Sequence, residues 1–93
     1  MSPEFYSKTK DDIEAYLEAA LEENDPKLVA AALGDIARAK GMTQIAQKTG
    51  LGRESLYKAL SAEGNPELST ILKVMEALGL TLHARTGKTR KAA

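Results

Sequence analysis

The sequence predicts an all-α fold of five helices, with one short strand near the C-terminal end. Apolar residues recur at i, i+3, i+4 and i+7 in successive segments, which is the spacing of one helix face. Gly, Pro and Asn residues separate these segments. Charged residues stand at the segment ends that the helix dipole favours. The chain of 93 residues is long enough for one modest core, which must be mainly aliphatic because aromatic residues are few.

The first predicted helix runs from Thr9 or Lys10 to about Glu23. Asn24-Asp25-Pro26 ends it and begins the second helix, with Asp25 as N-cap and Pro26 at the first helical position. The apolar face of the first helix comprises Ile13, Tyr16, Leu17, Ala20 and Leu21.

The second helix extends to about Lys40 and closes on Gly41, with Arg38 and Lys40 placed well for the dipole at its C-terminal end. Its apolar stripe comprises Leu28, Val29, Ala32, Leu33, Ile36 and Ala37. A short third helix follows from about Thr43 to Thr49 and ends at Gly50.

The fourth helix spans about Arg53 to Ala62 and ends near Gly64, and Asn65-Pro66 forms a turn. The fifth helix runs from about Leu68 to Leu78 and is closed by Gly79. Its inward residues are predicted to be Leu68, Ile71, Leu72, Met75 and Leu78.

Leu80 to Arg85 alternates weakly between apolar and polar residues, which is compatible with one short strand. The basic tail over 87–93, rich in small residues, is expected to be disordered. The tail and Arg85 offer sequence-independent, salt-dependent contacts to DNA, or are merely solvated.

Residues 42–61 match a helix-turn-helix motif, in which two short helices cross over a tight turn. Gly50 falls at position nine, counted from Met42, where the turn needs a left-handed backbone. Small or apolar residues occupy the packing positions four, five, ten, fifteen and eighteen: Ile45, Ala46, Leu51, Leu56 and Ala59. The joint match predicts a DNA-binding motif.

The second motif helix would leave one outward stripe, formed by Arg53, Glu54, Tyr57, Lys58 and Ser61. Such a helix presents its N-terminal part to the major groove. Arg53 suits a bidentate contact to guanine, and Glu54 suits a cytosine amino group. Tyr57 suits a thymine methyl group or a phosphate, and Lys58 and Ser61 suit phosphates or secondary base contacts. For each single residue the alternative is an ordinary solvated side chain.

Further candidate contacts to DNA flank this stripe. Thr43 is expected to cap the third helix and to help hold a phosphate, with Gln44 beside it. Gly52 and Ser55, at the start of the fourth helix, complete the candidate set. Asn65 either reaches the DNA backbone or only forms its turn.

Charge is distributed unevenly along a chain of zero net charge. Residues 1–25 carry eight acidic against two basic residues, a balance of −6, and residues 26–93 carry +6. Such asymmetry indicates different partners for the two parts. The basic part suits a phosphate backbone, whereas the acidic part suits a basic protein or folds over its own neighbour.

Three segments resemble the Cro/cI-type (XRE) helix-turn-helix family, and more narrowly the HigA-like addiction module antidote proteins. They are Gly50–Ser61, Gly64-Asn65-Pro66 and Leu72–Gly79. The segments Tyr16–Leu21 and Ala31–Arg38 carry the narrower resemblance. The resemblance implies a lambda-repressor-like DNA-binding domain over 25–86, preceded by an acidic arm and helix over 1–24.

The resemblance also implies the antitoxin of a type II toxin–antitoxin pair. Such a protein binds operator DNA as a dimer, represses its own operon and neutralises a small basic RelE/HigB-like toxin that cleaves mRNA. On charge, the toxin-binding residues would be Asp11, Asp12, Glu14 and Glu18. Two positions depart from the family pattern. Met42 replaces a Gln that commonly contacts the DNA backbone, and Gly52 replaces a commonly capping Ser.

An enzyme is disfavoured, since His83 is the one histidine and neither a phosphate loop nor a metal-binding spacing occurs. No cofactor, metal or membrane partner is expected, and the absence of cysteine fits the cytoplasm. The main alternative is a stand-alone XRE-type regulator without a toxin; a third is an interaction module that has lost DNA binding. Either the Leu80–Arg85 segment or the fifth helix would hold the homodimer.

Overall fold

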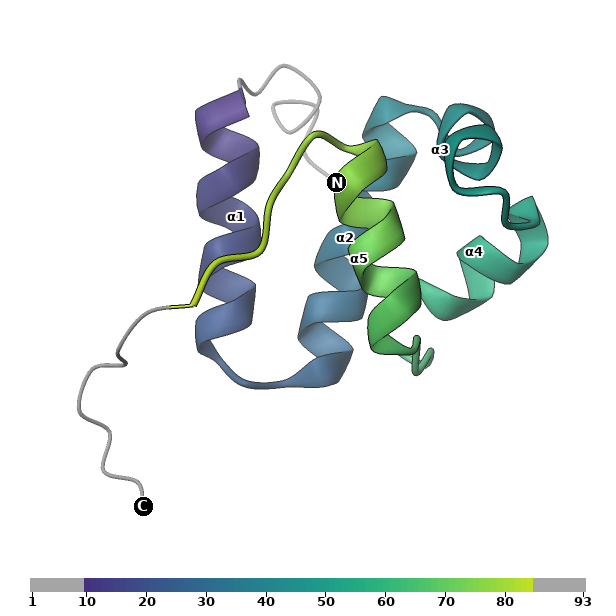
Figure 1. Cartoon of the computed structure of the whole chain (residues 1–93). Coiled ribbons are helices and arrows are strands. Elements are labelled where there is room, and N and C mark those ends of the chain that lie inside the picture. The colour runs from purple at the N-terminus through teal and green to yellow at the C-terminus, as the bar shows by residue number, and fades with distance from the viewer. Residues whose placement is uncertain (1–9, 85–93) are drawn as a thin grey trace.

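The computed structural model describes residues 10–84, which form five α-helices and no strand. The helices are α1 (Lys10–Glu22), α2 (Pro26–Lys40), α3 (Met42–Thr49), α4 (Arg53–Ala59) and α5 (Leu68–Ala77). Figure 1 shows α1 and α2 side by side and antiparallel, with α3 and α4 on the far side of α2 and α5 packed across the middle. The all-α prediction with five helices is therefore confirmed.

The link between α1 and α2 follows the predicted turn chemistry. Asn24 adopts a positive φ of 57° just after α1, a conformation that Asn tolerates better than most residues. Asp25 is the N-cap of α2, and its Oδ1 accepts a hydrogen bond of 3.0 Å from the backbone N–H of Lys27. This cap and Pro26 at the first turn begin α2, as expected.

One aliphatic core joins the helices. The largest side chains that are fully buried are Leu33, Ile36, Ile45, Leu56, Leu60 and Val74. Leu17 and Ala20 of α1 belong to the same core, so α1 is packed onto the other helices rather than standing apart. No aromatic side chain of the described residues is buried in this core, which confirms the aliphatic prediction.

The predicted inward face of α5 was wrong at two of its five positions, Leu68 and Leu72, and it omitted Val74. Leu68 is 62% exposed and Leu72 is 43% exposed, whereas Val74 is fully buried. The inward stripe is Ile71, Val74, Met75 and Leu78, which has the same i, i+3, i+4 and i+7 spacing as the predicted stripe. Because both stripes are apolar, only the tertiary packing decides which of them faces inward. Leu28 of α2 and Tyr16 of α1 were likewise predicted inward and are exposed.

Two predicted boundaries also differ. α4 ends at Ala59 instead of Ala62, because Leu60 leaves the helix with φ −96° and ψ 55° and buries its side chain completely. The segment over 80–84 runs from the end of α5 back toward α1 and forms no strand (Figure 1). A strand needs a neighbouring strand for its hydrogen bonds, and residues 10–84 supply none.

Predictions for residues 1–9, for Arg85 and for the 87–93 tail lie outside the described residues. None of the helices α1 to α5 combines the length and the hydropathy that a membrane-spanning segment requires.

The chain that follows α4 approaches α2 closely at Gly34. A Cβ atom added to Gly34 would collide with the backbone carbonyl oxygen of Leu60. Backbone at this contact cannot move aside as a flexible side chain can. Gly34 therefore allows the end of α4 to pack directly on α2.

We predict that Gly34→Ala lowers the free energy of unfolding by about 1–3 kcal/mol, because the added methyl group overpacks this contact. Urea unfolding measures the change. Gly52→Ala is the matched control: φ at Gly52 is −71°, and an added Cβ would meet nothing closer than the Ser55 Oγ at 3.8 Å. The control should change stability by less than about 1 kcal/mol. Equal effects of both substitutions would contradict the packing role of Gly34.

Candidate nucleic-acid interface

The helix pair α3 and α4 is joined by a short turn that the chain itself braces. Gly50 ends α3 with φ 77°, and its N–H donates to the Ala46 carbonyl oxygen at 2.9 Å. The Thr49 hydroxyl donates to the Ile45 carbonyl oxygen at 2.8 Å and accepts from the Leu51 N–H at 3.3 Å. Gly50 thus adopts the left-handed conformation expected at position nine. The bracing by Thr49 was not foreseen, although a Thr in the last turn of a helix commonly bonds backward to its carbonyls.

The packing positions of the predicted motif face the core. Ile45 and Leu56 are fully buried, and Ala46, Leu51 and Ala59 are half-buried. Met42 is 4% exposed, so its side chain packs in the core. This burial accounts for the apolar Met42 at the first motif position. The helix-turn-helix family that the sequence resembles commonly has a Gln there, which contacts the DNA backbone.

The start of α3 corrects one prediction. α3 begins at Met42 with Gly41 as its N-cap, so Thr43 lies inside the helix and caps nothing. No side chain caps this helix end. Gly41 takes the cap position with φ 120°, which also lets its N–H close α2 on the Ala37 carbonyl oxygen at 2.9 Å. Thr43 and Gln44 are both exposed.

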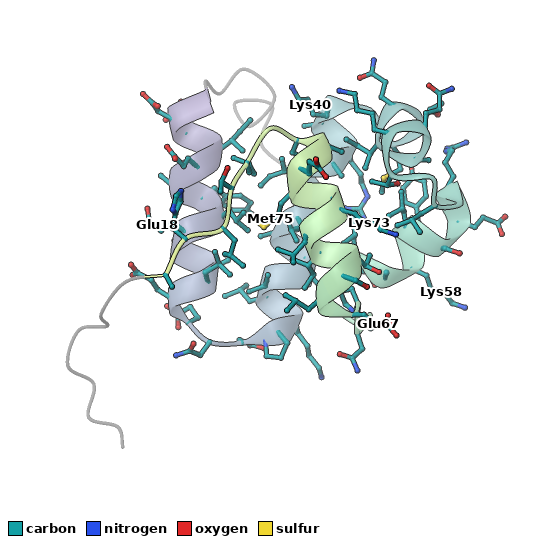
Figure 2. The ribbon with its side chains drawn as sticks, viewed as in Figure 1. Glu18, Lys40, Lys58, Glu67, Lys73 and Met75 are labelled. Carbon is teal, nitrogen blue, oxygen red and sulfur yellow. The ribbon has the colours of Figure 1, made fainter. Side chains whose placement is uncertain are left out.

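The predicted reading residues at the start of α4 share one exposed surface. Gly52 is the N-cap of α4, in an extended conformation and without a side-chain cap. The five α4 residues of the candidate set all have exposed side chains: Arg53, Glu54, Ser55, Tyr57 and Lys58. Figure 2 shows Lys58 projecting from α4 on the opposite side of the molecule from Glu18 of α1.

Ser61 and Asn65 lie beyond the end of α4. The Ser61 hydroxyl donates to the Lys58 carbonyl oxygen at 3.0 Å and so closes the helix. Ser61 is half-buried and does not extend the α4 surface as the longer predicted helix implied. Asn65 is exposed in the turn before α5.

Tyr57 is flanked by two cations. The Cζ atoms of Arg53 and Arg38 each lie 5.6 Å from the centre of the Tyr57 ring, within the range of cation–π attraction. Arg53 precedes Tyr57 by one turn of α4, so this contact follows from i, i+4 spacing. Arg38 comes from α2, and sequence reasoning assigned it only a place at the end of that helix.

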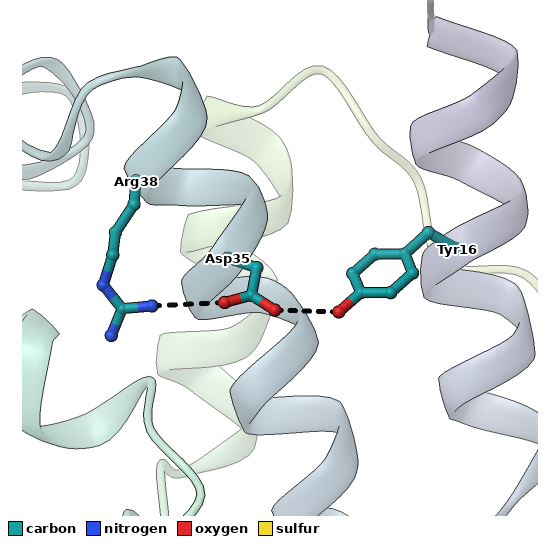
Figure 3. A network of polar contacts seen from close by, with 3 residues as sticks. All are labelled: Tyr16, Asp35 and Arg38. Atoms are coloured by element: carbon teal, nitrogen blue, oxygen red, sulfur yellow. Dashed lines mark hydrogen bonds and ion pairs between the residues drawn. The ribbon is translucent and has the colours of Figure 1, made fainter. Parts of the chain in front are cut away.

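A polar network links Arg38 to α1 (Figure 3). The Tyr16 hydroxyl donates to Asp35 Oδ2 at 2.8 Å, and Arg38 Nη1 donates to Asp35 Oδ1 at 3.4 Å. The Asp35–Arg38 pair has the i, i+3 spacing of neighbours on one helix face, which is a signal that the sequence did contain. The partnership of Tyr16 with Asp35 spans two helices and had no such signal.

The acidic residues assigned to toxin binding all lie on α1. Asp11, Asp12, Glu14 and Glu18 have exposed side chains. Over residues 10–22 five acidic residues stand against Lys10, whereas over residues 42–59 three basic residues stand against Glu54. The α1 segment and the α3–α4 segment therefore carry net charges of opposite sign, and they lie on opposite sides of α2 (Figure 1).

We predict that the Tyr16 hydroxyl loses its proton at a higher pH than the hydroxyl of an ordinary tyrosine. Partial burial, the hydrogen bond to Asp35 and the negative charge of Asp35 raise the pKa of Tyr16 to about 12. An unfolded tyrosine ionises near pH 10. The stability contributed by the protonated hydroxyl is therefore complete below pH 10 and is lost between about pH 10 and about pH 12, as the unfolded state releases its proton first.

Tyrosinate absorbance, followed in the native protein and in Tyr16→Phe, measures this ionisation. The substitution should remove the tyrosine ionisation centred near pH 12. The difference in unfolding free energy between the two proteins should shrink across the same pH window. Ionisation of Tyr16 near pH 10 in the folded protein would contradict the hydrogen bond to Asp35.

Comparison with known proteins places this geometry in a family context. A family model described as "Probable addiction module antidote protein" matches residues 3–86. An uncharacterized protein of Haemophilus influenzae is 46% identical over 80 residues, which cover 86% of this chain and 82% of that protein. No solved structure matches the chain.

Proposed function

Because the chain belongs to the family of probable addiction module antidote proteins, we propose that it is a DNA-binding antitoxin. It would bind a toxin and also repress its own operon. Family membership over residues 3–86 supports the first role. The exposed face of α4, with Arg53, Tyr57 and Lys58 outward and Leu56 inward, is the observation that carries the second.

α3, the turn and α4 act as the helix-turn-helix of a lambda-repressor-like (XRE) domain. The buried Ile45 and Leu56 and the left-handed Gly50 support this assignment. α4 enters the major groove of operator DNA, where Arg53 binds a guanine edge and Glu54 accepts from a cytosine amino group. Tyr57 packs beside Arg53 and orients its guanidinium.

Backbone contacts fix the position of α4 in the groove. Lys58, Ser55 and the exposed start of α3, at Thr43 and Gln44, supply donors to phosphates on either side. Gly52 lets the DNA backbone approach the first turn of α4 closely. Ser61 and Asn65 follow α4 in the sequence and are the outermost members of this set of DNA-backbone contacts.

A homodimer presents two copies of α4 to two operator half-sites, because one helix reads only a few base pairs. Leu68 and Leu72 lie one turn apart on α5 and are both exposed, so they form an apolar strip on one helix face. A second copy of the chain covers this strip. The 80–84 segment, which follows α5, adds Leu82 at 41% exposure.

The toxin is a small basic protein of the RelE/HigB kind, and it binds the acidic face of α1. Asp11, Asp12, Glu14 and Glu18 attract such a partner electrostatically. This face lies away from α4, so toxin and DNA bind to separate surfaces (Figure 2).

The DNA upstream of the protein's own reading frame provides the test of operator binding. We predict binding at least about 10³-fold tighter than to an unrelated duplex, with two chains per operator. Arg53→Ala should reduce this discrimination by about 1–3 kcal/mol, because it removes a bidentate base contact. Fluorescence anisotropy with both duplexes measures the two affinities.

Lys27→Ala is the control for Arg53→Ala, since Lys27 is an exposed cation in the first turn of α2. It should leave the ratio of operator to unrelated affinity unchanged. Equal wild-type affinity for the two duplexes would refute the repressor role.

Neutralising the α1 face tests toxin binding. The combined change Asp11→Asn, Asp12→Asn, Glu14→Gln and Glu18→Gln should weaken the toxin complex about tenfold or more, since loss of one charge pair already costs this much. Operator affinity should not change. Calorimetry with the basic protein encoded beside this gene measures the affinity.

Glu63→Gln with Glu67→Gln is the matched control, because both acids are exposed and lie outside α1. An unchanged toxin affinity of the α1 variant would place the toxin on another surface. If no neighbouring protein is captured at all, the protein is a stand-alone regulator.

A further inference from the structure

Arg38 stands outside the 42–61 motif and yet reaches its exposed surface. Its guanidinium Cζ lies 5.6 Å from the centre of the Tyr57 ring, as does that of Arg53. One aromatic ring of α4 thus holds a cation from α2 and a cation from its own helix. The two guanidinium groups therefore lie within roughly 11 Å of each other, on a ring that attracts both.

The internal pairing of Arg38 is weak. Its ion pair with Asp35 has a single N–O distance of 3.4 Å, and the two side chains are 39% and 49% exposed. Such exposed pairs contribute little to stability. A guanidinium carries five N–H donors, and within residues 10–84 Asp35 receives the hydrogen bond that Arg38 makes. The guanidinium that carries the other donors lies beside the Tyr57 ring on a partly exposed side chain.

Asp35 also serves two donors at once. Its Oδ2 accepts from the Tyr16 hydroxyl at 2.8 Å while its Oδ1 faces Arg38 (Figure 3). The shorter bond, from Tyr16, holds the Asp35 carboxylate in place. The longer contact restrains the Arg38 guanidinium but does not occupy all of its N–H donors. Arg38 is held in one place by Asp35 on one side and by the Tyr57 ring on the other.

We infer that Arg38 is a phosphate ligand of the DNA interface, with Asp35 as its positioning residue and Tyr57 as the platform that it shares with Arg53. This inference rests on the proposed binding of operator DNA. A phosphate oxygen supplies a second negative partner for Arg38, whose ion pair with Asp35 is long and exposed, and the forked donors of Arg suit phosphate oxygens. The DNA-binding surface therefore extends from α4 onto α2.

A phosphate contact leaves a signature that a base contact or a structural role does not. Each phosphate neutralised contributes about 0.9 to the slope of log affinity against log salt concentration. We expect Arg38→Gln to make this slope less steep by about 0.9 for each chain bound, thus by about 1.8 for a dimer, and to weaken binding about tenfold per chain, on the operator and on an unrelated duplex alike. Arg38→Lys, which keeps the charge, should retain the wild-type slope.

Lys27→Gln is the matched control, because it removes one exposed positive charge from the same helix eleven residues away, about 16 Å along the axis. Its salt slope should equal that of the wild type. Thermal unfolding of each variant, followed by circular dichroism, checks that the helices persist.

Two results would overturn the inference while leaving operator binding intact. One is a wild-type slope in Arg38→Gln. The other is a loss of affinity for the operator alone, which would make Arg38 a base reader. A wild-type protein that binds the two duplexes equally would instead refute the proposed function, and the assignment of Arg38 with it.

Discussion

The direct contact between Gly34 of α2 and the backbone of Leu60 determines how the rest of the molecule is arranged. Because Gly34 has no side chain, the chain leaving α4 packs against the α2 backbone, and Leu60 is completely buried there. At this contact Leu60 leaves α4 with φ −96° and ψ 55° and turns its side chain into the core. The same approach brings Tyr57 within reach of Arg38, so the packing of two helices also positions the polar surface.

The five helices, and the turns before α2 and after α3, follow from local chemistry, and they were therefore predictable from the sequence. Asp25, Pro26 and the left-handed Gly50 act within a few residues of where they stand. The choice between two apolar stripes on α5 depends on neighbours far away in the sequence. Leu72 and Val74 are equally suited to a core, and only the packing against α2 and α3 decides that Val74 is buried. The early end of α4 has the same origin, since it depends on Gly34.

The candidate site divides in the same way. The exposure of Arg53, Glu54 and Tyr57 was predictable because the motif positions that must be buried leave these residues outward. The contribution of Arg38 could not be predicted in this way, because it arises where α2 and α4 come together. Tyr16 shows where periodicity alone misleads. It fits the apolar stripe of α1, but its hydroxyl binds Asp35 and the residue remains 40% exposed.

If DNA binds the surface formed by α4 and the end of α2, as we propose, it leaves the acidic face of α1 uncovered. Backbone amide chemical shifts, recorded while the upstream duplex is added to the labelled protein, show which residues the DNA contacts. We expect the shifts to change at Arg53, Tyr57 and Arg38 and to stay unchanged at Glu14 and Glu18. Shifts centred on α1, or none on α4, would contradict this proposal.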